Sequence, residues 1–65
     1  MTGNYKAYEI PSEQDLLKCK QAIWRGLFHR SEGIGFSKRI FILINPNNLI
    51  TIKKKYPSMS IKEVN

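Results

Sequence analysis

Cys19 is the only cysteine in this chain of 65 residues, so the hydrophobic core has to hold the fold together. One cysteine excludes a disulfide within the chain. One cysteine with one histidine, His29, also falls short of the roughly four ligands of a structural zinc site. A domain of this length buries only about 60% of the surface of its unfolded chain, so its stability is expected to be marginal. Association with another chain or a bound partner is the remaining means of reinforcement.

The sequence contains no segment that we expect to enter a membrane. Its longest apolar run, residues 40–44, is far shorter than the roughly 20 residues that span a bilayer. The first residues lack the charged and then apolar pattern of a signal peptide. A lone cysteine fits a reducing, intracellular compartment. We therefore expect a soluble, cytoplasmic protein that forms one domain over residues 1–65.

Residues 12–30 are predicted to form an amphipathic helix. Ser12 is a suitable N-cap, and Glu13 and Asp15 place negative charge in the first turn, where the helix dipole favours it. At 100° per residue, seven apolar residues share one side of this helix. They are Leu16, Leu17, Cys19, Ile23, Trp24, Leu27 and Phe28. This side is expected to face the core.

Three short strands are predicted around the helix, at residues 4–10, 38–44 and 49–55. The second and third form a hairpin, because residues 45–48 read Asn-Pro-Asn-Asn and Pro46 is preset for the second position of a turn. A last helical turn, capped by Ser58 or Ser60, is expected to reach Val64. The predicted fold is α+β, with one amphipathic helix packed on a small antiparallel sheet in the order β-α-β-β.

The predicted hairpin register, with Ile44 opposite Leu49, gives the sheet two apolar faces. One face carries Phe41, Leu43, Ile50 and Ile52 and is expected to pack against the helix. The other carries Ile40, Ile42, Ile44 and Leu49. A second apolar face usually marks an interface, so we expect either a homodimer through these residues or a covering by the N-terminal segment.

The same register gathers five cations at the base of the hairpin: Lys38, Arg39, Lys53, Lys54 and Lys55. Like charges that lie directly opposite each other are destabilising, and a bound polyanion would relieve the repulsion. Lys18, Arg25 and Arg30 are expected to extend this basic surface along the helix, and Tyr56 is placed to stack on an unpaired base. The alternative is that these residues are ordinary solvated strand ends, with lysine also blocking edge-to-edge aggregation.

Catalytic chemistry is not predicted for this chain. Cys19 and His29 are ten residues apart on the expected helix, about 15 Å along its axis, which is too far for a dyad. Cys19 is therefore interpreted as a small core residue, and His29 as a cation at the helix end. The sequence contains none of the common nucleotide-binding, zinc or redox motifs, so no metal or cofactor is expected.

Eleven Lys and Arg residues against five Asp and Glu residues give a net charge of +6, which points to an anionic partner. The leading hypothesis is a non-enzymatic protein that binds the phosphate backbone of DNA or RNA. The runner-up is a small protein-interaction module, an inhibitor or accessory subunit, that docks on an acidic surface of a larger partner. Contact with an anionic membrane surface is weaker, because the apolar side of the helix is already needed for the core.

Overall fold

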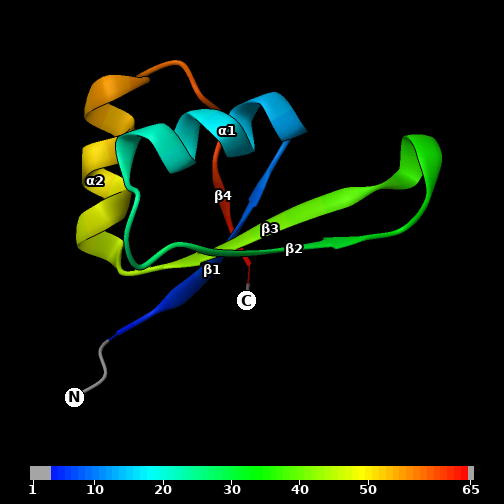
Figure 1. Cartoon of the computed structure of the whole chain (residues 1–65), viewed down its shortest axis with the longest axis horizontal. Coiled ribbons are helices and arrows are strands. Elements are labelled where there is room, and N and C mark those ends of the chain that lie inside the picture. The colour runs from blue at the N-terminus through cyan, green and yellow to red at the C-terminus, as the bar shows by residue number, and fades with distance from the viewer. Residues whose placement is uncertain (1–3, 65) are drawn as a thin grey trace.

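An antiparallel sheet with two helices on one face forms this protein (Figure 1). The computed structural model describes residues 4–64. The elements follow one another as β1 (Lys6–Ile10), α1 (Glu13–Ala22), β2 (Phe28–Glu32), β3 (Arg39–Ile44), α2 (Pro46–Lys55) and β4 (Lys62–Glu63). The strand order is β2-β3-β1-β4, so each helix connects two strands that have a third strand between them. This is the β-α-β-β-α-β arrangement of ferredoxin-like folds, and it confirms the predicted α+β class.

The two central strands form where the sequence alternates most clearly. β3 has the sequence Arg-Ile-Phe-Ile-Leu-Ile, and its three isoleucines are buried on the side of the helices. β1 pairs with β3 in antiparallel register and adds Tyr8 and Ile10 to the same face. β-branched and aromatic side chains fit such a pleated surface well, and both strands were predicted.

Helix α1 begins as predicted but ends eight residues early. The Ser12 hydroxyl accepts a hydrogen bond from the Asp15 backbone N–H at 3.3 Å, which confirms the N-cap. The helix ends at Ala22, and Trp24 is 78% exposed. Gly26 adopts a φ of +73°, a left-handed conformation that interrupts helical geometry. The predicted helix over residues 12–30 is therefore wrong beyond residue 22, and residues 28–32 form a strand instead.

The segment predicted as a turn and a third strand is helix α2. The Asn45 side chain accepts a hydrogen bond from the Asn47 backbone N–H at 2.9 Å, and Pro46 occupies the first helical turn. The same residue types start turns and helices, since both need a capping oxygen and a preset φ. Ile52 is buried and Leu49 packs against the core, a spacing of three that suits a helix and not a strand.

The C-terminal segment is a strand and not the predicted helical turn. β4 pairs with β1, with Tyr8 opposite Glu63 and Glu9 opposite Lys62. The Val64 backbone N–H continues this pairing by donating to the Ala7 carbonyl oxygen at 2.9 Å. β1 is thereby paired on both sides, which leaves β2 and β4 as the edge strands of the sheet.

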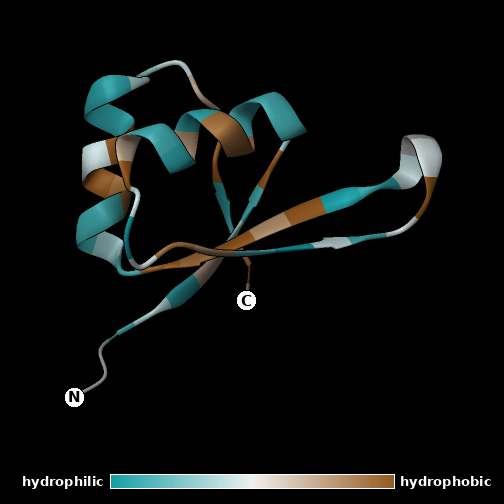
Figure 2. Ribbon diagram, viewed as in Figure 1, coloured by the Kyte–Doolittle hydropathy of each residue, from teal (hydrophilic) through white to brown (hydrophobic). Residues whose placement is uncertain are grey.

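The core lies between the helices and one face of the sheet. Figure 2 shows hydrophobic segments along β3 and in the middle turns of α1 and α2, where the two layers meet. The buried residues are Tyr8, Ile10, Leu16, Cys19, Ile23, Ile40, Ile42, Ile44 and Ile52. The predicted assignment of the two sheet faces is therefore wrong. Ile40, Ile42 and Ile44 belong to the core and are not available to a partner, Leu49 packs against that core from α2, and Phe41 and Leu43 point to the opposite face.

Candidate functional site

The predicted cluster of five cations does not form, because its members lie on different elements. Lys38 lies directly before β3 and Arg39 is the first residue of that strand, whereas Lys53, Lys54 and Lys55 are in the last turn of α2. Their expected proximity depended on a hairpin, and residues 38–55 form a strand followed by a helix instead. The repulsion between cations on paired strands, which favoured a bound polyanion in the sequence analysis, is therefore absent.

Lys38 and Arg39 are instead neutralised by carboxylates from distant parts of the chain. Arg39 binds Glu9 of β1 through two parallel hydrogen bonds, Nε to Oε2 at 3.1 Å and Nη2 to Oε1 at 2.9 Å. Lys38 forms an ion pair with Glu13 at the start of α1. The hydrogen bond from Arg39 lowers the pKa of Glu9 below its ordinary value, and the bond from Lys38 does the same to the pKa of Glu13.

Two further ion pairs occupy the edges of the sheet. Arg30 Nη2 lies 3.0 Å from Glu32 Oε2 on β2, and Lys6 Nζ lies 3.8 Å from Glu63 Oε2 across β1 and β4. Within residues 4–64, seven cations take part in no ion pair. They are Lys18, Lys20, Arg25, Lys53, Lys54, Lys55 and Lys62. Most of them belong to the helices, so the positive charge of the protein is concentrated on the helical layer.

Lys18 and Lys55 converge on Tyr56 and, with it, form what we call the Tyr56 patch. The Lys18 Nζ lies 5.7 Å from the centroid of the Tyr56 ring, and the Lys55 Nζ lies 5.8 Å from it. Lys18 comes from α1, whereas Lys55 ends α2 and Tyr56 is the C-cap of that helix. Tyr56 is half-buried, and two flexible ammonium groups lie within cation–π distance of its ring at one place on the surface.

The lysines at the end of α2 also have a local structural role. Three cations in the last turn, Lys53, Lys54 and Lys55, lie at the negative end of the helix dipole and stabilise it. Lys53 and Lys54 project to different sides of α2, since consecutive helical residues are rotated by about 100°. They extend positive charge around the end of the helix, beside the Tyr56 patch.

The other predicted contact residues lie elsewhere. Arg25 stacks on its neighbour Trp24, with its guanidinium carbon 4.4 Å from the ring centroid. Its loop lies beside Asn48 in the first turn of α2, at the opposite end of that helix from Tyr56. Arg30 and Arg39 belong to the sheet. The structure thus unites three of the nine predicted contact residues, Lys18, Lys55 and Tyr56, with Lys53 and Lys54 adjacent to them.

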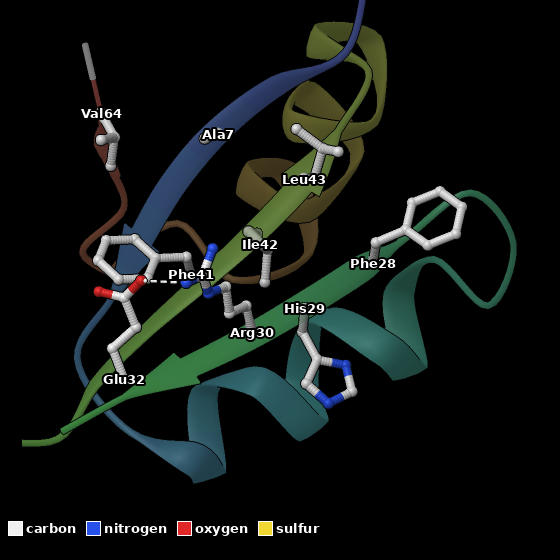
Figure 3. Close-up of a pocket in the computed structure, with 9 residues that line it drawn as sticks. All are labelled: Ala7, Phe28, His29, Arg30, Glu32, Phe41, Ile42, Leu43 and Val64. Atoms are coloured by element: carbon white, nitrogen blue, oxygen red, sulfur yellow. Dashed lines mark ion pairs between the residues drawn. The ribbon is translucent and has the colours of Figure 1, made fainter. Parts of the chain in front are cut away.

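A second surface, the sheet face away from the helices, was not predicted as a site. It has a hollow of about 510 Å³ whose lining comes from all parts of the sheet, including Phe28, Phe41, Leu43 and Val64 (Figure 3). The prediction missed it because Phe28 was assigned to a helix and Leu43 to the core-facing side. Phe28–Glu32 contains one apolar residue and is exposed along its whole length, so no alternation of apolar and polar residues indicated a strand there.

The structure places the one cysteine of the chain in the core and its one histidine on an exposed strand. Cys19 is fully buried, which confirms its interpretation as a core residue, and its Sγ lies 3.7 Å from the Met59 Sδ. Burial, together with the nearby Asp15 charge, raises the pKa of the Cys19 thiol to about 11. His29 lies on β2 and not at a helix end. Among residues 4–64, no three His, Cys, Asp or Glu side chains are grouped to hold a metal ion.

Comparison with protein-family models, with curated proteins and with solved structures finds no match for this chain. In the part of the chain that the structure describes, neither helix is long and apolar enough to cross a bilayer. The function of this protein is therefore inferred from the charge and shape of its surfaces.

Proposed function

We propose that the protein binds nucleic acid, without catalysing a reaction, through the basic surface of its helical layer. The Tyr56 patch carries this proposal. Two ammonium groups from different helices converge there, and within residues 4–64 neither is ion-paired with a carboxylate. Such groups attract phosphates at long range. When they neutralise the phosphates of a nucleic acid, the cations condensed around that nucleic acid are released.

The helical layer is favoured over the sheet face because of where the carboxylates lie. On the sheet, the guanidinium groups of Arg30 and Arg39 already bind Glu32 and Glu9. A phosphate there would have to displace a carboxylate and would be repelled by it. Four of the five acidic residues form ion pairs away from the Tyr56 patch, and the fifth, Asp15, forms none with Lys18 in the described residues.

The shape of the patch favours a single strand over a duplex. Lysine acts as a flexible point charge toward phosphate, and an unpaired base stacks on the ring of Tyr56 when an ammonium group leaves the ring to bind a phosphate. Stacking of this kind does not depend on base identity, so the expected binding is weakly sequence-dependent. Lys53 and Lys54 provide further phosphate contacts around the end of α2.

The test is the salt dependence of binding to short single-stranded DNA, single-stranded RNA and duplex DNA, measured by fluorescence anisotropy. The affinity for single strands is expected to fall steeply with salt. The double variant Lys18→Gln/Lys55→Gln is expected to bind more weakly and to lower the salt slope by about 1.4, because each lost phosphate contact on a single strand is worth about 0.7. Both side chains are exposed, so the fold is expected to persist.

The matched control is Lys20→Gln/Lys62→Gln, which removes the same number of charges elsewhere. Lys20 is two residues from Lys18 and therefore about 200° around α1, and Lys62 lies on β4. This control is expected to keep most of the wild-type slope. Equal losses in both variants would contradict a defined site. Absence of binding at low salt would overturn the proposal and would favour the runner-up, an acidic protein surface, as the partner of the patch.

A further inference from the structure

An apolar row crosses the open face of the sheet from edge to edge. By the strand register, Phe28 of β2 lies opposite Leu43 of β3, and Leu43 lies opposite Ala7 of β1. Val64, directly after β4, is hydrogen-bonded to Ala7. These four residues form what we call the apolar row. Phe28, Leu43 and Val64 remain 60%, 41% and 37% exposed.

The apolar row lines an open hollow in the sheet face. The hollow of about 510 Å³ runs along the row and includes the half-buried Phe41 (Figure 3). Neither helix covers this face, because α1 and α2 both pack on the opposite side of the sheet (Figure 1). A contiguous apolar surface of this kind, next to polar residues, is typical of a protein interface.

Two of the three cations beside the apolar row are already paired with carboxylates, and Lys62 is the third. Arg39 is bound to Glu9 by two hydrogen bonds, and Arg30 is bound to Glu32. Lys62 lies opposite Glu9 and contributes to the lowering of its pKa. Burying this face therefore leaves neither carboxylate without a cation, and within residues 4–64 Lys62 is the one cation of the face that forms no ion pair. The face fits an apolar and nearly neutral partner surface and does not fit a polyanion.

We propose that the open face of the sheet is the contact surface for a second copy of this chain. Two copies with a net charge of +6 each repel one another, and the repulsion is smallest where the facing surfaces are closest to neutral. The open face carries three cations, Arg30, Arg39 and Lys62, against two carboxylates, Glu9 and Glu32. When the two sheets face each other, the basic helical layers lie on the two outer sides, as far apart as the dimer permits.

The size of the face sets the expected strength of this dimer. With strands about 4.8 Å apart and about 3.4 Å per residue, the sheet offers a flat footprint on the order of 300 Å² per copy. A standard stable interface buries roughly 800 Å² per partner. The dimer is therefore expected to be weak and to form only as the protein concentration rises.

This arrangement has a consequence that rests on the proposed function. A dimer through the sheets presents two Tyr56 patches on opposite outer surfaces, because the helices lie on the far side of each sheet (Figure 1). Such a dimer is expected to hold two nucleic-acid strands at once and to bind a long strand more tightly than a monomer does.

Sedimentation equilibrium without nucleic acid tests the dimer independently of any binding function. The average mass of the wild type is expected to rise from 7.6 kDa toward twice that value with concentration. The variant Leu43→Glu places a charge in the middle of the apolar row and is expected to remain monomeric. The matched control, Ile50→Glu, adds the same charge at an exposed apolar residue of α2 and is expected to dimerise like the wild type.

Concentration-dependent amide shifts of the wild type give a second measurement that needs no variant. We expect the shifts to change at Ala7, Phe28, Leu43 and Val64 and to stay constant along α1 and α2. A wild-type protein that remains monomeric at every concentration overturns the proposal, as does a dimer that Ile50→Glu disrupts and Leu43→Glu does not. If the dimer forms but two differently labelled oligonucleotides are not brought together, the dimer stands and its bridging of two strands fails, whereas the proposed function fails only if single strands do not bind at low salt.

Discussion

Ion pairs between residues far apart in the sequence decide which cations this protein can offer to a partner. Arg39 binds a carboxylate thirty residues earlier in the chain, and Lys38 binds one twenty-five residues earlier. Both cations are thereby withdrawn from the basic surface. Lys18 and Lys55 are not neutralised in this way within residues 4–64, and they meet at Tyr56. The functional difference between these residues lies in their neighbours and not in their type.

The pair between Glu9 and Arg39 predicts a loss of stability in acid. The pKa of Glu9 is lower in the folded protein than its ordinary value of 4.5, so its contribution is present above that pH and is lost as the pH falls through the folded pKa. The variant Glu9→Gln is expected to flatten the acid limb of a plot of unfolding midpoint against pH. Glu63→Gln, whose pair with Lys6 is longer at 3.8 Å, serves as the control and is expected to keep the wild-type profile. Identical profiles for wild type and Glu9→Gln would contradict the assignment.

Helix α2 is the element on which the candidate site depends, because it holds Lys55 and Tyr56 against α1. Its start is determined by the Asn45 side chain and by Pro46, and its inward side carries Leu49 and Ile52. The cations of its last turn favour the helical state through the helix dipole. A strand in its place would carry alternate residues to opposite faces and would separate Lys55 from Lys18.

The N-cap of α2 is predicted to stabilise the fold. Asn45→Ala removes the oxygen that accepts the Asn47 backbone N–H and is expected to lower the free energy of unfolding by about 1 kcal/mol. The matched control is Asn47→Ala in the first turn, where the side chain is exposed and alanine favours the helix. Urea unfolding followed by circular dichroism measures both. An unchanged midpoint for Asn45→Ala would show that the cap does not stabilise the helix.

The whole molecule is a two-layer protein in which one sheet face forms the core and the other is open. Nine buried residues make up that core, which is small even for a chain of 65 residues. Domains of this size have little stability to spare. A second copy on the open face would add a third layer and would bury the apolar row.

Linkage between folding and association predicts that the melting temperature depends on protein concentration. If a second copy binds only the folded chain, the melting temperature of the wild type is expected to rise by several degrees between dilute and concentrated samples. For a domain of this size, 1 kcal/mol corresponds to about 4–8 °C. Scanning calorimetry across a concentration series measures this shift. The melting temperature of Leu43→Glu is expected to be the same at every protein concentration. A melting temperature of the wild type that is also independent of concentration would argue against the dimer.

Local patterns in the sequence determined the α+β class, the strands β1 and β3, the N-cap at Ser12 and the burial of Cys19. Each of these depends on interactions within a few residues or on the exclusion of a disulfide and a zinc site. The net positive charge was likewise readable from composition, and the anionic partner inferred from it stays a prediction. Two of the nine predicted contact residues, Lys55 and Tyr56, are neighbours in the chain, so their proximity needed no fold.

Tertiary structure alone decided which secondary structure residues 23–32 and 49–55 adopt and which face of the sheet remains exposed. Phe28–Glu32 forms a strand because β3 offers it a partner, and nothing within that segment reveals a partner eleven residues away. Over so short a segment, the apolar residues at 49, 50 and 52 fit the period of 3.6 residues of a helix as well as the period of 2 residues of a strand. Successive side chains of a strand point to opposite faces of the sheet. The predicted pairing of β3 with residues 49–55 placed Phe41 and Leu43 on the side of the core, whereas the structure buries Ile40, Ile42 and Ile44 there. The meeting of Lys18 with Lys55 and Tyr56 follows from the same long-range packing of α1 against α2.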